Sequence, residues 1–432
     1  MADGNIIKSV KKIIESDPER KYIVVSAPGK RYSGDTKVTD LLYACYKSLT
    51  ENGVCAAGFA PVRARFESLV RELNMDIDID DVLDATEKRI DEEKSEDFTA
   101  SRGEYLCAWV VSKVLGAKFI DSENVVYFKE NGKLDGEKTY KAIKEACADC
   151  ELAVFPGFYG QDINGKVKTF SRGGSDISGA IVARAMQASL YENWTDVSGF
   201  LACDPRIVDS PKPIKKLSYK ELRELSYMGA NVLHSDSIFP VRKANIPIQI
   251  KNTFRPQDEG TSILPSSRYM PAGNTVTGVA GKKNFTVIFI EKSLMNAEIG
   301  FIAKVLEVLA RENISVEHIP SGIDTMSLVI ASEQLTDFKL QRIIEGIQTE
   351  VSPDTVRIIE NIALIATVGQ GMSSSVGTSA RLFNAIAAAN INIKMIDQGS
   401  SEMNIIVGVK NDDYEKCIRA IYSEFFTSAP CE

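Results

Sequence analysis

The sequence predicts an α/β protein in which a three-layer α/β/α domain with a mostly parallel sheet is followed by two smaller βαββαβ units. Strands and helices alternate through residues 1–255, which indicates a largely parallel sheet with helices on both faces. Residues 284–360 and 361–432 share one order of strands and helices, which indicates an internal repeat. The 432 residues also exceed what one hydrophobic core accommodates. Residues 256–283, rich in Pro, Gly, Ser and Thr, are therefore expected to link the two parts.

Composition and charge argue against several classes of partner. Hydrophobic residues make up 44% and charged residues 25% of the chain, as in an ordinary folded protein. The net charge of −8 argues against nucleic acid or an anionic membrane as the main partner. No apolar run approaches the roughly 20 residues that span a bilayer, and no signal peptide is visible, so a cytoplasmic protein is expected. The eight cysteines show no framework of spacings; the close pair Cys147 and Cys150 is expected to be structural, and no metal site is predicted.

The elements of the first domain follow from apolar spacing and from turn residues. Residues 5–15 carry apolar side chains at helical spacing, and Asp17-Pro18 ends that helix. Residues 21–27 are typical of a buried strand, which a polar loop and a helix beginning near Thr39 follow. A charged helical hairpin is expected over residues 59–99, against the sheet edge. The later elements are helices at 105–115 and 219–227, strands at 117–121, 152–156 and 248–250, and a hairpin at 125–132; Ser218 and Glu221 form a capping box for the second helix.

The densest chemistry lies between a strand that ends near Phe170 and a helical pattern that follows it. The sequence S-R-G-G-S-D occupies residues 171–176 there. A glycine pair lets the backbone turn tightly and approach a ligand, and free N–H groups at a helix start favour an anion. Arg172 adds a forked cation that suits a carboxylate or a phosphate, and Asp176 is placed to complement the helix dipole or to meet a metal. The alternative is that Ser175 or Asp176 only caps the helix while Arg172 is a solvated charge.

A second polar loop follows one helix later. The sequences W-T-D-V-S-G at 194–199 and C-D-P-R at 203–206 are typical of a strand that ends in a polar loop. In an open α/β sheet, the loops at the carboxyl ends of strands form the ligand crevice. Two such loops in succession predict a nucleotide site.

At these residues the sequence resembles the aspartate kinases of the amino-acid kinase family, in particular the monofunctional type with tandem ACT domains. The pair S-R-G-G-S-D and W-T-D-V-S-G-F-L-A-C-D-P-R is specific, and the similarity continues over nearly the whole chain. The resemblance implies that ATP, together with Mg²⁺, phosphorylates the side-chain carboxylate of L-aspartate to give 4-phospho-L-aspartate. That reaction is the first step of lysine, threonine and methionine biosynthesis.

The resemblance also implies roles for individual residues. Arg172 would grip a carboxylate of aspartate and Glu104 its ammonium group, while Asp176 would organise the network around the transferring phosphoryl group. The substrate-binding residues implied in this way are Thr39, Glu104, Arg172, Gly173, Gly174 and Ser175. The ATP-binding residues are Ser26, Thr195, Asp196, Leu201, Arg206, Asn231 and Val232. For Thr39, a helix cap is the alternative.

Three departures from the family pattern bear on activity. The family usually has tyrosine where this chain has Leu201, and lysine where it has Asn231. The family also begins with a strand that ends in K-F-G-G-S, and Met1 to Gly4 align just after that motif. Because one oxyanion donor is worth about 2.7–4 kcal/mol, a chain without that lysine and its neighbouring amides is expected to have little activity on its own. The alternative function is a catalytically impaired amino-acid-sensing regulator with a kinase fold.

Residues 284–432 resemble a tandem pair of ferredoxin-like ACT domains, which bind amino acids at loops between helices and strands. The expected strands are 285–290, 315–319, 326–331, 356–360, 364–368, 393–397 and 404–409, and the expected helices are 299–311, 337–349, 379–389 and 414–425. The resemblance implies feedback inhibition by an end-product amino acid. The effector-binding residues that it implies are Met295, Glu298, Gly300, Val316, Glu317, Ser321 and Gly322. The alternative is that these are only turn residues.

The charge of one of these residues favours a particular effector. Glu317 would suit an ammonium group, so lysine is the first choice of inhibitor and threonine the second. Each repeat also leaves a sheet edge exposed unless it is paired, which predicts a homodimer through the ACT domains. Assembly of dimers into a tetramer stays open.

Overall fold

The computed structural model describes residues 1–171, 173–230, 232–233, 237–265 and 275–427. Over these residues the chain forms two compact units, and each is described by itself. The first unit holds residues 1–199 and the described part of 232–268, and the second holds the described parts of 200–231 and 269–432. Over the described residues, none of the helices has the length and apolar character that crossing a bilayer requires.

The first unit contains most of the helices before residue 250. Its helices are α1 (Gly4–Glu15), α2 (Val38–Asn52), α3 (Ala56–Leu73), α4 (Asp80–Glu93), α5 (Glu96–Leu115), α6 (Gly136–Ala146), α7 (Gly174–Ala185) and α9 (Phe239–Lys243). Its strands are β1 (Tyr22–Val25), β2 (Lys118–Phe119), β3 (Ala153–Pro156), β4 (Tyr159–Gln161), β5 (Val167–Thr169), β6 (Tyr191–Thr195), β8 (Ile248–Asn252) and β9 (Thr261–Leu264).

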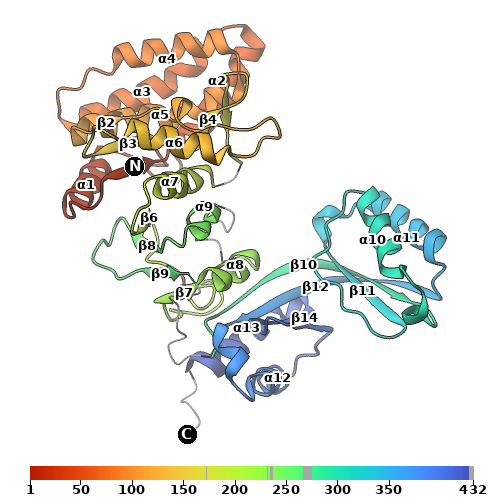
Figure 1. Ribbon diagram of the computed structural model, residues 1–432. Helices are drawn as coiled ribbons and strands as arrows, with labels where there is room; N and C mark the ends of the chain where they lie inside the picture. The colour runs from red at the N-terminus through yellow and green to blue at the C-terminus, as the bar shows by residue number, and fades with distance from the viewer. Residues whose placement is uncertain (172, 231, 234–236, 266–274, 428–432) are drawn as a thin grey trace. The chain divides into compact units, whose positions relative to one another are not determined.

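The first unit is built on a parallel sheet in the order β1-β3-β2. Because side chains alternate between the faces of a strand, Val154 and Phe155 of β3 join different cores. Val154 packs in the core shared with α2–α5, and Phe155 packs in the core shared with α6 and α7. Helices therefore cover both faces of this sheet (Figure 1), and the predicted three-layer α/β/α architecture is confirmed.

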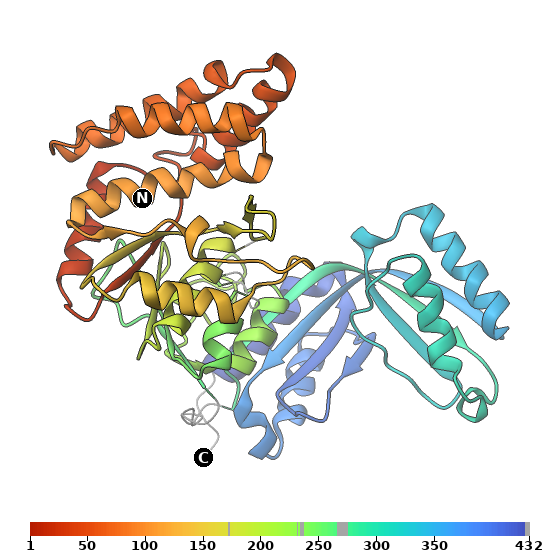
Figure 2. The ribbon, with the colours of Figure 1, turned by 45° about the horizontal axis from the view of Figure 1, so that its top comes forward.

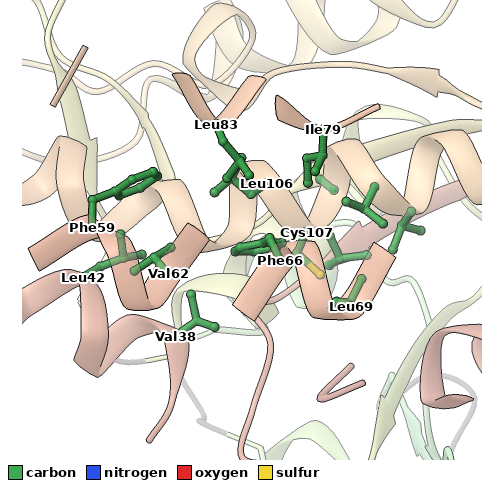
Figure 3. Packing of buried hydrophobic residues seen from close by; sticks show 14 of the residues in the cluster. Val38, Leu42, Phe59, Val62, Phe66, Leu69, Ile79, Leu83, Leu106 and Cys107 are labelled. Atoms are coloured by element: carbon green, nitrogen blue, oxygen red, sulfur yellow. The ribbon is translucent and has the colours of Figure 1, made fainter. Parts of the chain in front are cut away.

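The helices α2 to α5 enclose one of these two cores (Figure 3). Leu42 of α2, Phe66 of α3, Leu83 of α4 and Leu106 of α5 are fully buried there. Each such side chain contributes roughly 1.5–3 kcal/mol when it is removed from water. The hairpin of α3 and α4 therefore packs on α2 and α5, not against the sheet edge as expected, because its apolar stripe finds a matching helical surface there.

A second sheet of the first unit contains β6, β8 and β9. β6 runs parallel to β8, and β9 runs antiparallel to it. Residues 248–250 are predicted to be the strand that closes the sheet, ahead of a linker at 256–283. β9 is a strand inside that expected linker, since Ile248 pairs with Ile263. The boundary at residue 255 itself stays a prediction.

The second unit contains one helix from before the expected linker and all elements of the two repeats. Its helices are α8 (Tyr219–Tyr227), α10 (Phe301–Arg311), α11 (Asp337–Val351), α12 (Thr378–Ala388) and α13 (Tyr414–Tyr422). Its strands are β7 (Lys216–Ser218), β10 (Gly278–Glu291), β11 (Thr325–Ala331), β12 (Thr355–Val368), β13 (Met395–Asp397) and β14 (Asn404–Lys410). The capping box predicted at Ser218 and Glu221 is confirmed, and it opens α8.

The two repeats share one antiparallel sheet in the order β11-β10-β12-β14-β13. β10 and β12 run side by side along their whole length (Figure 2), with Gly278 opposite Val368 and Glu291 opposite Thr355. The separate strands expected at 356–360 and 364–368 are thus one strand, because β10 and β12 stay paired across two register shifts, one between Lys282 and Phe285 and one between Phe285 and Val287. The strand expected at 315–319 is reduced, among the described residues, to one isolated bridge between His318 and Val329.

Candidate active site

Two neighbouring parallel strands end at the same edge of the first sheet. β1 ends at Val25 beside Pro156, the last residue of β3. Gly157 continues the pairing, since its N–H donates to the carbonyl of Val25 at 2.9 Å. Ser26, a predicted ATP-binding residue, directly follows β1 at this edge and is exposed. Ligand crevices of α/β sheets form at such carboxyl ends.

Glu104 lies against this edge from α5. The helix comes close because Gly103 has no side chain, since a Cβ there would lie 2.9 Å from Cβ of Ala27. The Glu104 carboxylate accepts a hydrogen bond from the backbone N–H of Ala27. Glu104 is only 5% exposed, and its Oε2 has no hydrogen-bond partner among the described residues. Such a buried acceptor is costly unless a ligand donor or cation satisfies it.

Burial raises the pKa of Glu104 from 4.5 to about 7, although the Ala27 N–H and Arg102 favour the charged form. Between pH 4.5 and about 7 the folded protein therefore keeps a proton that the unfolded chain releases. Stability falls as pH rises through a window of this kind, here by about 3 kcal/mol in total.

We expect the unfolding free energy of the wild type, measured relative to Glu104→Gln, to fall by this amount between pH 4.5 and about 7. Denaturant unfolding at several pH values measures that difference. The glutamine variant is the reference because it lacks the titrating group. A difference that stays constant over this window would show that Glu104 titrates normally.

The turn after β3 and the first turn of α7 are in close contact. A Cβ on Gly157 would lie 2.8 Å from Oγ of Ser175, and a Cβ on Gly174 would lie 2.5 Å from Cδ2 of Phe158. Phe158 has a φ of +79°, and its N–H donates to Oγ of Ser178 at 3.0 Å. The two glycines therefore let Ser175 approach the carboxyl end of β3, the edge at which Glu104 also lies.

The start of α7 tests one part of the alternative interpretation of the S-R-G-G-S-D loop, the capping role of Ser175 or Asp176. The N-cap is Gly173, with a φ of +75° and no side-chain cap hydrogen bond. The alternative that Ser175 or Asp176 caps this helix is therefore wrong. Arg172 lies outside the described residues. Free N–H groups at a helix start favour an anion, so ligand binding at the start of α7 stays a prediction.

Asn193 of β6 is a site residue that sequence reasoning missed. Its Nδ2 donates to Oδ1 of Asp176 at 2.8 Å, and the Tyr191 hydroxyl donates to the backbone carbonyl of Asp176 at 3.2 Å. Both partners come from one face of β6, which continues to Thr195. The alternation of polar residues along this strand was the signal that could have identified Asn193.

The loop after β6 carries two of the predicted ATP-binding residues. Oγ1 of Thr195 donates to Oδ1 of Asp196 at 3.2 Å, and the carbonyl of Thr195 accepts the N–H of Thr253 at 2.8 Å. Asn252 of β8 donates to the carbonyl of Asp196 at 3.4 Å and to Oγ of Ser198 at 3.0 Å. The ends of β6 and β8 thus hold the Thr195–Asp196 loop in place.

Other predicted kinase residues are divided between the two units. Leu201 and Arg206 belong to the second unit, and Arg206 is 86% exposed; its guanidinium pairs with Asp204 at 2.6 Å. Val232 belongs to the first unit and is half-buried. Asn231 lies outside the described residues. Thr39 is the second residue of α2, whose N-cap is Lys37, so a cap role for Thr39 is wrong.

The predicted effector residues gather around the first repeat. Met295 and Val316 pack in one hydrophobic core. Gly300, with a φ of +82°, is the N-cap of α10. Asp324, which sequence reasoning missed, accepts the N–H of Leu294 at 2.9 Å, so the loop before α10 lies beside the turn that contains Ser321 and Gly322.

The two predicted effector carboxylates have different partners. Glu298 pairs with Lys292 at 2.5 Å and with Lys304 at 3.0 Å. These lysines lower the pKa of Glu298, Lys292 most strongly. Glu317 instead accepts a hydrogen bond from the hydroxyl of Tyr227, which is the last residue of α8.

Comparisons with known proteins agree with this arrangement. A model of the amino acid kinase family matches residues 1–252, and an ACT domain model matches residues 365–425. Aspartokinase 3 of Bacillus subtilis (strain 168) is 37% identical over 440 residues, which cover 99% of this chain and 96% of that protein.

Solved structures show the same likeness. The crystal structure of Clostridium acetobutylicum aspartate kinase has a TM-score of 0.94 and 52% identity, and the match covers 98% of this chain and 97% of that chain. The E. coli aspartokinase III structure in complex with lysine and aspartate (T-state) has a TM-score of 0.73 and 25% identity, and the match covers 98% of this chain and 97% of that chain. The family model and a relative with 37% identity each match more than half of this chain. The chain therefore belongs to the aspartokinases, within the amino acid kinase family.

Proposed function

We propose that this chain transfers the γ-phosphoryl group of ATP to the side-chain carboxylate of L-aspartate, giving 4-phospho-L-aspartate. The observation that carries the proposal is the buried Oε2 of Glu104, at the edge where β1 and β3 end. An α-ammonium group at this point would give that oxygen the partner it lacks among the described residues. The relatives that are named aspartokinases support the same substrate.

The residues of the site would act by positioning and by neutralising charge. Phosphoryl transfer needs little covalent help from a protein, and the aspartate carboxylate is already ionised at neutral pH, so no general base is required. The N-terminal amides of α7 and Oγ of Ser175 would orient the carboxylate. Asp176, held by Asn193, would face the cations around the transferring group.

The described residues of the site suit an Mg²⁺ ion that arrives with ATP. No three His, Cys, Asp or Glu side chains come together in the part of the chain that the structure describes. Mg²⁺ is commonly held by one or two carboxylates and by substrate phosphates, and Asp176 is suited to be one of these carboxylates. The ion would supply charge neutralisation on the phosphates when bound.

The experiment that tests this function traps the acyl phosphate product. The chain is incubated with Mg-ATP and aspartate, and hydroxylamine converts the product to a hydroxamate. Glutamate replaces aspartate in the control. A second arm uses the chain with a K-F-G-G-S strand added ahead of Met1, which tests the expectation of low activity without it. Formation of hydroxamate from aspartate in either arm supports the proposal. Absence of hydroxamate in both arms contradicts it.

We also propose that lysine inhibits the enzyme by binding at Glu317. The support is that Glu317 receives a hydrogen bond from a neutral phenol, whereas Glu298 is already paired with two lysines. An ammonium group would therefore gain more from Glu317. The E. coli aspartokinase III structure in complex with lysine supports a lysine effector over threonine.

Glu317→Gln should weaken lysine binding by at least about tenfold, because a hydrogen bond to a charged group contributes roughly 1.5–3 kcal/mol. Isothermal titration calorimetry of the full chain measures the affinity. Glu307→Gln is the matched control, since Glu307 is an exposed acid of α10 that pairs with Arg311. Equal affinities for the wild type and Glu317→Gln would place the ammonium site elsewhere.

We further propose a homodimer formed through the repeats. Ile299 is 98% exposed, and Leu294 and Ile323 are also mostly exposed in loops of the first repeat. Apolar side chains gathered in this way favour a protein interface. Sedimentation equilibrium of the full chain distinguishes monomer, dimer and tetramer.

A further inference from the structure

The helix α8 is anchored to the side of the second repeat. Glu221, in its first turn, is fully buried. Its Oε1 accepts hydrogen bonds from Oγ1 of Thr277 at 2.6 Å and from the N–H of Gln370 at 2.9 Å. One turn further, Oε2 of Glu224 accepts from Nδ2 of Asn404 in β14 at 2.7 Å. These bonds fix the first two turns of α8 to the residues that flank β10 and β12 and to β14.

The other end of α8 touches the first repeat. Tyr227, its last residue, donates its hydroxyl to Oε2 of Glu317. The ammonium of Lys282 lies 5.1 Å from the centre of the Tyr227 ring. Tyr227 is still 49% exposed, so a small ligand can approach the hydrogen bond from solvent. One helix thus connects the second repeat with the segment that is expected to hold the effector.

The charge around Glu317 allows a cationic ligand to compete with the Tyr227 hydroxyl for this carboxylate. No ion pair joins Glu317 to a Lys, Arg or His within the described part of the chain, and the phenol of Tyr227 brings no charge. No counter-ion in the described part of the chain therefore competes with an incoming cation for the Glu317 carboxylate. The hydrogen bond from the phenol has one charged partner, the Glu317 carboxylate, whereas an ammonium group also attracts that carboxylate as an opposite charge, so an amino-acid effector can displace the phenol.

We infer that Tyr227 belongs to the effector site, where its hydroxyl occupies Glu317 in the absence of ligand and yields that carboxylate to the ammonium group of the effector. This inference rests on the proposed binding of lysine at Glu317. Burial and the Glu317 carboxylate raise the pKa of Tyr227, so the hydroxyl stays protonated and remains a donor at neutral pH.

Displacement of the Tyr227 hydroxyl would affect the kinase domain through the residues that follow α8 in the chain. Residues 228–232 directly follow α8, and two of them, Asn231 and Val232, are expected to bind ATP. Release of Tyr227 leaves the last turn of α8 without its bond to the first repeat, while Glu221 and Glu224 keep the earlier turns in place. Effector binding would thereby alter the end of the helix that leads to the nucleotide segment.

Tyr227→Phe tests the inference, because it removes the hydroxyl and keeps the ring. Without the competing phenol, the variant should bind lysine about tenfold more tightly in isothermal titration calorimetry, and saturating lysine should inhibit it less completely than the wild type. Tyr414→Phe is the matched control, since the Tyr414 hydroxyl donates to the carbonyl of Gly281 at 2.7 Å in the same unit. Its lysine affinity should equal that of the wild type.

The outcomes separate this inference from the proposed regulation. If the wild type binds lysine and Glu317→Gln does not, the lysine site stands; equal affinities of Tyr227→Phe and the wild type then overturn the role of Tyr227 alone. If the wild type binds neither lysine nor threonine, the proposed regulation fails first and the inference fails with it. Tyr227→Leu, which lacks both hydroxyl and ring, provides a second variant, and it should also bind lysine more tightly.

Discussion

Replacing Glu104 with glutamine is expected to lower kcat/KM for aspartate by about two orders of magnitude, mostly through a higher KM for aspartate. Glu104 is buried and its Oε2 lacks a partner among the described residues, so the substrate ammonium would form its ion pair in a site shielded from water. Loss of one member of such a pair costs about 2–5 kcal/mol, or roughly 30- to 4,000-fold. Initial rates at varied aspartate and saturating Mg-ATP measure the effect.

The KM for ATP should change little, because Glu104 is assigned to the amino acid and not to the nucleotide. Glu96→Gln is the matched control on the same helix, since Glu96 is exposed in the first turn of α5. A Glu104→Gln enzyme with a normal KM for aspartate would mean that another group holds the ammonium.

Gly157→Ala is expected to reduce kcat about 100-fold while the protein stays folded. The added methyl group would lie 2.8 Å from Oγ and 2.9 Å from Cα of Ser175, so the backbone at the start of α7 has to move. A displacement of about 1 Å in a positioned group can cost 10²-fold in rate. Overpacking of this kind typically costs 1–3 kcal/mol of stability, which thermal unfolding would measure beside the kinetics.

Gly399→Ala serves as the control, because nothing lies within 4 Å of a Cβ at that glycine. Its kcat and its melting temperature should match those of the wild type. Normal turnover in Gly157→Ala would show that Ser175 does not need its observed place beside the end of β3.

Local patterns predicted much of the fold. Ser218 and Glu221 lie three residues apart, so a short motif was sufficient to predict α8. The glycine pair likewise predicted a tight entry into α7. The cap is Gly173 itself and not a neighbouring Ser or Asp, because a positive φ turns the chain without any side-chain hydrogen bond.

Contacts between distant segments could not be predicted in this way. Tyr227 and Glu317 are 90 residues apart, and no short-range pattern encodes their hydrogen bond. Segment 315–319 has the composition of a strand, but among the described residues it forms only an isolated bridge with β11, between His318 and Val329. Residues 361–363 separate two predicted strands, yet β12 passes through them, because two register shifts keep β10 and β12 paired on either side.

The shared strands β10 and β12 also set the order in which the second unit can be completed during synthesis. Residues 278–282 pair with 364–368, and the whole first repeat lies between those two segments in the chain. Contacts of such wide sequence separation form slowly, because a long loop has to close first. On the ribosome, the first repeat can close through β11 soon after β10 emerges. The first residues of β10 stay unpaired until β12 is synthesised. The sheet is complete only when β14 pairs with β12.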